Sequence, residues 1–222
     1  MFFKKYMVAL KVLMKKPVML WGLSLLLALL TFLGMYLTCS IPVVAIVVSY
    51  LFTLGGVKLY MDGLKGKEVN SKQLFAAFNK NWLKSAAAMG WQQLWTQIWG
   101  FVPVMGTIKR LSYRFVPYII SIHPEISAFD ALKLSMRMTQ GKRLQMWLAD
   151  LVLAGAIVTT VAILAALAWV RYIGFFFLLA LLSVLLVVAL FGKIFVGLYQ
   201  ASFFSEEELE QYLAAPDVTV AE

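Results

Sequence analysis

Five ionisable residues lie inside or beside long apolar stretches of this chain, where their side chains could do chemistry. They are Lys109, Arg110, Arg114, Asp150 and Lys193. A charged group is costly in hydrocarbon, so ionisable residues within membrane spans usually mark a binding site or a path. Counted along predicted helices, Arg114, Asp150 and Lys193 fall at a similar depth, roughly 5–12 Å below one membrane surface. At that depth Asp150 is placed to neutralise one of the two cations.

The remaining positive charges, above all those of Lys109 and Arg110, have no acidic partner within a predicted span. This surplus favours a basic groove that holds an anionic group, for which a lipid phosphate is the natural candidate. The alternative is snorkelling, in which the Lys and Arg stems reach back to the interface and bind nothing specific. The sequence leaves both interpretations open.

A second polar group lies on the predicted helix Ser85–Phe101. It consists of Gln92, Gln93 and Gln97. Gln93 and Gln97 fall on the side of the helix opposite three tryptophans that recur every four residues. These tryptophans are Trp91, Trp95 and Trp99. The glutamines either line a polar, wetted path or form hydrogen bonds that hold neighbouring helices together.

Catalytic chemistry has little support. The chain contains no zinc-type pair of histidines, no G-x-S-x-G motif, no P-loop and no cluster of carboxylates at one depth. With only Cys39 and His123, one chain cannot build a disulfide framework or a Cys/His metal site. We therefore expect no catalytic site, no metal and no cofactor, and we interpret His123 as a residue that ends a helix at the interface.

The composition shows what kind of scaffold must position these residues. Of the 222 residues, 62% are hydrophobic and 14% are charged, whereas soluble domains average about 45–50% apolar and about 25% charged residues. The run from Pro17 to Val57 contains no charged residue and is long enough for two crossings of roughly 20 residues each. In this setting the net charge of +9 indicates attraction to anionic lipid headgroups rather than binding of nucleic acid.

The expected fold is an all-α, polytopic transmembrane helical bundle of about six spans. The predicted spans are Val18–Leu37, Val43–Met61, Ser85–Phe101, Val104–Ile122, Trp147–Ala168 and Ile173–Tyr199. Short turns join them into three hairpin units, about 1–64, 65–124 and 125–204, which together form an integral membrane domain over 1–204. A basic amphipathic helix at the interface is expected before each hairpin. The second of these should be capped by Ser71, and the third should be capped by Ser127 and end near Gly141.

The positive charges set the expected orientation. Nearly all Lys and Arg residues outside the spans lie before the hairpins, and only Arg171 lies in one of the opposite turns. The positive-inside rule then places both termini in the cytoplasm. The fourth span is the least regular, because it contains Lys109, Arg110 and Arg114. A re-entrant hairpin over Ser85–Ile122 would satisfy the charge bias equally well.

The last segment, 205–222, is predicted to be an acidic cytoplasmic tail. Ser205 precedes Glu206, Glu207 and Glu208, and acidic residues stabilise a helix N-terminus. We expect a short helix that ends by about Ala215, before Pro216, and that is either solvated or docked on a partner.

Several runs between about Leu94 and Leu209 resemble one family of proteins. The runs are Pro103–Lys109, Leu111–Tyr113, Pro117–Ile119, Ser127–Ser135, Gly141–Lys142, Leu148–Leu151 and Tyr199–Phe204. The family is an uncharacterised domain-of-unknown-function group of bacterial polytopic membrane proteins, distantly similar to the membrane domain of some glycerophosphodiester phosphodiesterases. The sequence departs from the family pattern at His123, where an acidic residue is common, and at Ala149–Asp150, which keeps part of a Leu-rich motif. The resemblance implies a six-span protein of the bacterial plasma membrane, but no activity and no functional residues.

Two functions are therefore expected, from different classes. The first is a non-enzymatic membrane module that binds or handles anionic lipid or another amphiphile, in the manner of a transporter component. The second is a structural or accessory protein that forms a homo-oligomer or joins a larger membrane complex. The expected partners are anionic membrane lipids and further copies of the chain, not nucleic acid. An intramembrane enzyme has the least support.

Overall fold

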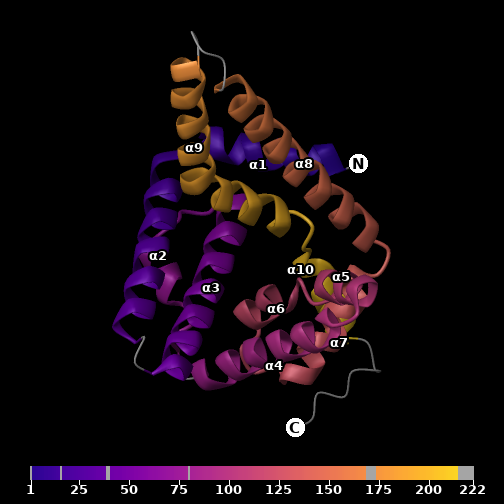
Figure 1. The fold of residues 1–222 in the computed structure, drawn as a ribbon. Helices are drawn as coiled ribbons and strands as arrows, with labels where there is room; N and C mark the ends of the chain where they lie inside the picture. The colour runs from indigo at the N-terminus through magenta and orange to yellow at the C-terminus, as the bar shows by residue number, and fades with distance from the viewer. Residues whose placement is uncertain (1, 16, 39–40, 80, 169–173, 215–222) are drawn as a thin grey trace.

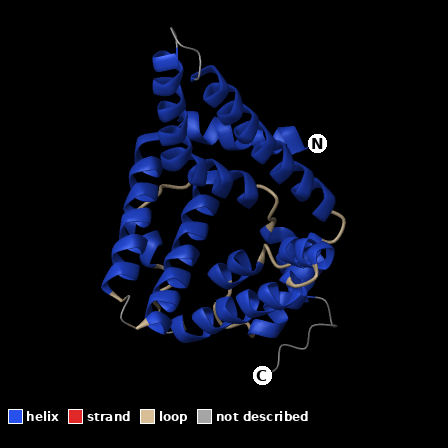
Figure 2. Ribbon diagram, in the orientation of Figure 1, coloured by secondary structure: helices blue, strands red, loops and turns tan. Residues whose placement is uncertain are grey.

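The computed structural model describes residues 2–15, 17–38, 41–79, 81–168 and 174–214, and every regular element in them is helical (Figure 2). The elements are α1 (Phe2–Lys15), α2 (Pro17–Leu37), α3 (Pro42–Leu64), the 3-10 helix η1 (Ser71–Phe75), α4 (Trp82–Gly100), α5 (Pro103–Ser112), α6 (Val116–Ile122), α7 (Ala128–Thr139), α8 (Arg143–Ala168), α9 (Gly174–Ala201) and α10 (Glu206–Ala214). The all-α prediction is confirmed for the described part of the chain.

Within the described residues, three helices are long and apolar enough to cross a membrane. They are α2 over Val18–Leu37, α3 over Pro42–Leu64 and α8 over Arg143–Leu167. A fourth is α9, if its two parts, Gly174–Val188 and Phe191–Ala201, which are inclined by 45°, count as one bent span. Length and composition thus give three, or up to four, candidate membrane spans.

The structure does not confirm six full spans. The helix α4, with its glutamines and Lys84, is not among the candidates. The predicted span Val104–Ile122 is divided into α5 and α6, of 10 and 7 residues. At about 1.5 Å of rise per residue, neither helix can cross a hydrocarbon core of roughly 30 Å.

The break between α5 and α6 has a local cause and a tertiary one. Pro117 lies in the first turn of α6. It has no backbone N–H, so it cannot continue the helical hydrogen bonds of α5. The Ser135 hydroxyl of α7 donates to the Ser112 carbonyl at 2.7 Å and accepts from the Phe115 N–H at 3.1 Å. Gln92 Nε2 of α4 donates to the Tyr113 carbonyl at 3.0 Å. Polar groups freed by the break are thus satisfied by α4 and α7.

The helix α3 lies at the centre of the packing, in contact with α2, η1, α4, α6 and α9. Its second half is buried, including Leu54, Leu59 and Met61. Gly55 allows the closest approach, because a Cβ there would lie 2.2 Å from the carbonyl oxygen of Leu74 in η1. This approach holds the η1 segment against the spanning helix.

The segments before the hairpins differ partly from expectation. Before α4 the chain forms only the short η1, and Asn70 rather than Ser71 is its N-cap. Before α8, Ser127 caps α7 as predicted, accepting from the Asp130 N–H at 3.2 Å, and Gly141 follows the helix with a φ of +79°. One face of α7 is buried against α4, α5 and α6, so this helix packs within the protein.

Two long hairpins extend away from a compact region. The pairs α2–α3 and α8–α9 point in different directions from the place where α3 meets α9 and α1 (Figure 1). The remaining helices, α4 to α7 and α10, gather on the side of α3 that faces away from α2. The predicted arrangement of three equivalent hairpins is therefore not confirmed.

Candidate functional site

Two of the five predicted site residues form an ion pair. Arg114 binds the Asp150 carboxylate through both terminal nitrogens, with Nη1 lying 3.3 Å from Oδ1. The Tyr199 hydroxyl donates to the same carboxylate. The pair is largely buried, with side chains 13% and 26% exposed. Asp150 thus joins the α5–α6 break to α8 and α9, and its charge is balanced within the protein.

The other three cations lie elsewhere. Lys193 is exposed on α9, and Arg110 is exposed on α5. The Lys109 ammonium lies over the Trp99 ring, 5.1 Å from its centroid, in a cation–π contact. The structure therefore does not bring the five residues into one groove.

The three glutamines separate in the same way. Gln92 is half-buried and bonds across to the Tyr113 carbonyl, whereas Gln93 and Gln97 are exposed. Gln92 acts as a contact between helices, which favours the second interpretation of this residue over a wetted path.

A different set of cations surrounds a pocket of about 270 Å³ between α1 and the end of α3. Its basic residues are Lys11 and Lys15 on α1, and Lys65 and Lys67 just after α3. Its apolar lining consists of Val8, Val12, Leu20, Leu64 and Val69. We call this the basic pocket. No acidic residue belongs to its described lining.

Local sequence explains how these elements meet. Val8, Lys11, Val12 and Lys15 recur at intervals of three and four residues, so they share one side of α1. Gly66 has a φ of +70°, which glycine adopts without penalty, and the chain turns there so that Lys65 and Lys67 flank the end of α3. A Cβ on Gly63 would lie 3.3 Å from Leu20 Cδ1, so a glycine at this position lets α2 approach closely.

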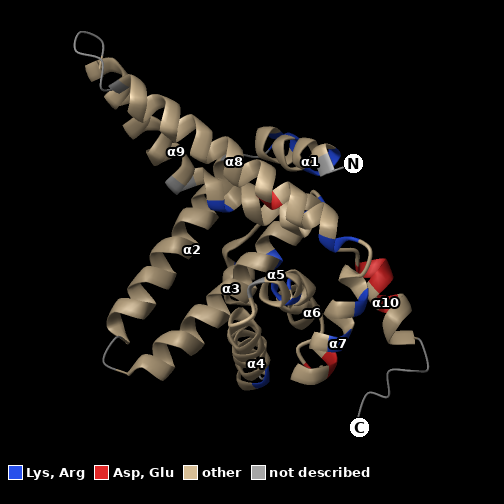
Figure 3. Ribbon diagram, turned by 45° about the vertical axis from the view of Figure 1, so that its right-hand side comes forward, with Lys and Arg blue, Asp and Glu red and all other residues tan. Residues whose placement is uncertain are grey.

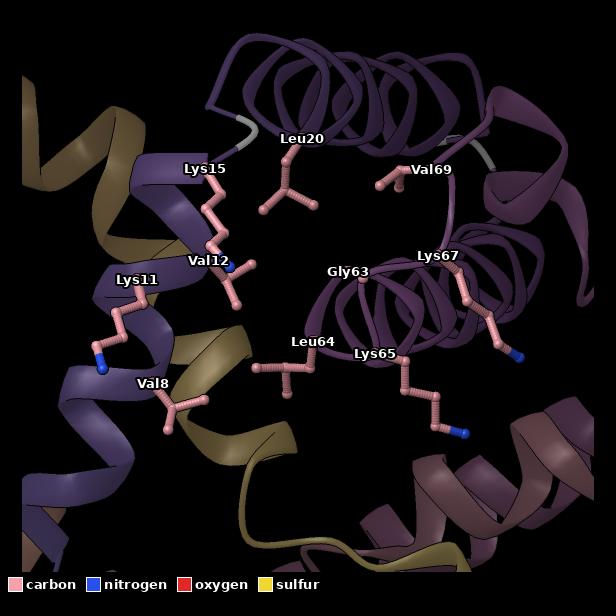
Figure 4. A pocket seen from close by; sticks show the side chains of 11 residues that line it. Val8, Lys11, Val12, Lys15, Leu20, Gly63, Leu64, Lys65, Lys67 and Val69 are labelled. Carbon is pink, nitrogen blue, oxygen red and sulfur yellow. The ribbon is translucent and has the colours of Figure 1, made fainter.

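The close view shows an apolar interior with a basic rim (Figure 4). Val12, Leu20 and Leu64 point into the space between α1 and α3, and the Lys15 side chain extends along its edge. The side chains of Lys65 and Lys67 point outward from the opposite wall. Such a pocket can take up an apolar group while its rim contacts an anionic one.

A second pocket of about 240 Å³ adjoins the first. The two share Val8, Leu64 and Lys65, and the second is also lined by Lys5, Ser202, Phe204 and Glu206. The Lys5 ammonium donates to the Ser202 carbonyl. Burial, and then the nearby charge of Lys142, lower the pKa of Lys5. Lys65 thus stands between two adjoining cavities.

Sequence reasoning did not identify the basic pocket, because its lysines were interpreted as signals of membrane orientation and as the polar side of interfacial helices on anionic lipid. A usable signal was present, since Lys11 and Lys15 are one helical turn apart and Lys65–Gly66–Lys67 directly follows an apolar helix. No group of three or more His, Cys, Asp or Glu side chains within the described ranges is arranged to hold a metal ion.

No family model, curated protein or solved structure matches this chain. The family resemblance of the sequence therefore stays a prediction.

Proposed function

We propose that this protein is a non-enzymatic membrane module that binds an anionic amphiphile, such as an anionic phospholipid, in the basic pocket. The observation that supports it most is the combination of an apolar interior with four lysines and no acidic residue in the described lining. Lipid acyl chains suit the interior, and a phosphate suits the rim, because each Lys near an anionic membrane surface adds favourable electrostatic energy.

The charge distribution supports the cytoplasmic leaflet as the source of this ligand. The basic pocket lies beside α1 and the end of α3, where Lys residues are dense, and the positive-inside rule assigns such segments to the cytoplasm. We propose accordingly that the protein lies in a bacterial plasma membrane with both termini inside.

Lipid retention measured on paired variants tests the proposal. Lys11→Ala together with Lys15→Ala removes two cations of the rim, and we expect phosphatidylglycerol binding to weaken by roughly tenfold or more. The measurement is native mass spectrometry of the detergent-solubilised protein, titrated with phosphatidylglycerol and with phosphatidylcholine of the same chain length.

The matched control is Lys72→Ala together with Lys84→Ala, which removes the same charge from two exposed residues outside both pockets. This control should bind phosphatidylglycerol as the wild type does. Equal losses in both double variants would show that net charge alone attracts the lipid, and the proposed site would be wrong.

The alternative proposal is an accessory or self-associating membrane protein. It is supported by the exposure of α8. Only 6% of an 18-residue apolar window in this helix is buried inside the protein, whereas 44% of the corresponding window in α3 is buried. The same mass spectra distinguish the two proposals, because a fixed oligomer without bound lipid would favour this alternative.

A further inference from the structure

The acidic helix α10 does not stand free in solution but lies against the basic side of the protein (Figure 3). Glu206 pairs with Lys65, Glu208 pairs with Lys142, and Glu210 lies 3.0 Å from the His123 ring. Leu209, between these residues, is completely buried. The helix is thus held by Leu209, by Tyr212 and Leu213, which pack against the same core, and by polar contacts with three separate segments.

The contact at Glu206 bears directly on the pocket. Lys65 lines both cavities, and Glu206 lines the second one. A carboxylate of the protein therefore already occupies one side of the Lys65 ammonium, where the anionic group of a ligand would bind. An ammonium that is paired in this way attracts a further anion less strongly.

The two ion pairs in the first turn of α10 are open to solvent. The Lys65–Glu206 side chains are 38% and 36% exposed, and those of Lys142–Glu208 are 28% and 39% exposed. Ion pairs that are this open to solvent contribute little to stability. An anionic membrane surface acts on the same lysines with comparable strength.

We propose that α10 is a tethered acidic competitor that binds Lys65 in the absence of ligand and releases it when an anionic amphiphile fills the two cavities. This inference rests on the proposed function and adds its regulation. The protein then binds anionic lipid more weakly with the first turn of α10 in place than without it, and lipid binding loosens α10.

Two neighbouring glutamates provide a matched test. Glu206→Gln removes the charge that faces Lys65, whereas Glu207→Gln removes the same charge from an adjacent exposed position. With short-chain phosphatidylglycerol as the probe, we expect Glu206→Gln to tighten binding roughly two- to fivefold. Glu207→Gln should leave the affinity within about 1.5-fold of the wild type. The measurement is the lipid titration by native mass spectrometry.

A second variant shows whether the effect passes through Lys65. In a Lys65→Ala background, Glu206→Gln should no longer tighten binding, as expected for a coupled pair. In the wild type, added phosphatidylglycerol should also speed hydrogen exchange in Glu206–Ala214, while phosphatidylcholine should not.

The outcomes separate this inference from the function on which it rests. Equal effects of Glu206→Gln and Glu207→Gln, or tightening that persists without Lys65, would overturn the competitor role while leaving the basic pocket intact. If the wild type shows no preference for phosphatidylglycerol over phosphatidylcholine, both the proposed function and the competitor role are wrong.

Discussion

At the scale of single residues, Asp150 lies where several segments of the chain meet. Its carboxylate accepts from Arg114 and from Tyr199, which lie at the α5–α6 break and on α9. The Tyr6 hydroxyl of α1 donates to the neighbouring Ala149 carbonyl. Four segments therefore meet around residues 149 and 150, and this contact has a structural role whatever the protein binds.

We predict that Arg114→Ala strongly destabilises the protein. This substitution leaves the Asp150 carboxylate, whose side chain is 26% exposed, without its counterion. Leaving a partly buried charge unpaired costs about 2–3 kcal/mol of stability. We expect a clear drop in Tm, which is measured by tryptophan fluorescence of the protein in detergent. Arg110→Ala, on the exposed side of α5, is the control and should leave Tm nearly unchanged.

A replacement of both partners separates charge from packing. Arg114→Met combined with Asp150→Asn removes both charges and keeps an acceptor for the Tyr199 hydroxyl, so it should be less destabilising than Arg114→Ala alone. If the double variant unfolds at a lower temperature than the single one, the pair does more than balance charge, and this explanation is wrong.

The residues also show how far sequence reasoning reaches. Arg114 and Asp150 do pair, as depth suggested, but the depth of Arg114 was counted along a span, Val104–Ile122, that the structure divides into α5 and α6. Lys193 failed the same reasoning because depth does not fix rotation, and its side chain lies on the exposed side of α9. The basic pocket was missed because its apolar lining comes from α1, α2 and α3, whose mutual packing no local pattern reveals.

At the scale of elements, several local signals predicted the structure, although the helix expected after Ser71 is only the short η1. The Ser127 cap, the end of α7 before Gly141 and the acidic helix α10 follow from adjacent residues and were predicted. The separation of α5 from α6 depends on Ser135 and Gln92, which lie on other helices. Pro117 is visible in the sequence, but the side chains on other helices that satisfy the polar groups at the break are not.

We predict that Ser135→Ala weakens the joint between α5 and α6. The Ser135 side chain is fully buried, and its loss leaves the Phe115 N–H without its hydrogen-bond acceptor, at a cost of about 1–3 kcal/mol. Hydrogen exchange at Tyr113–Val116 should become faster, and Tm should fall. Ser183→Ala, on the exposed side of α9, is the control for removing a hydroxyl. Unchanged exchange at the joint would contradict the role of Ser135.

At the scale of the whole molecule, the described far ends of both spanning hairpins are free of charged residues. In Figure 3 these described ends extend to the left and show no Lys, Arg, Asp or Glu, while α7, α10 and the N-terminus lie to the right. Arg171, between α8 and α9 in the sequence, lies outside the described residues. The contact between Lys5 of α1 and Ser202 after α9 also places the two terminal helices next to each other.

That contact favours an even number of crossings, and α2, α3, α8 and the bent α9 supply four. The six-span prediction differs from this at the α4–α5 turn, which six spans put outside the cell and four spans leave on the inner side or within the bilayer. We predict that Val102→Cys, in a chain with Cys39→Ser, resists a membrane-impermeant maleimide added to intact cells. Val102 is 49% exposed within the protein, so the membrane, not packing, must protect it. As a control, the same cysteine should react when the protein is in detergent. Reaction in intact cells would instead support the six-span topology, because only a full crossing by α4 brings this turn outside.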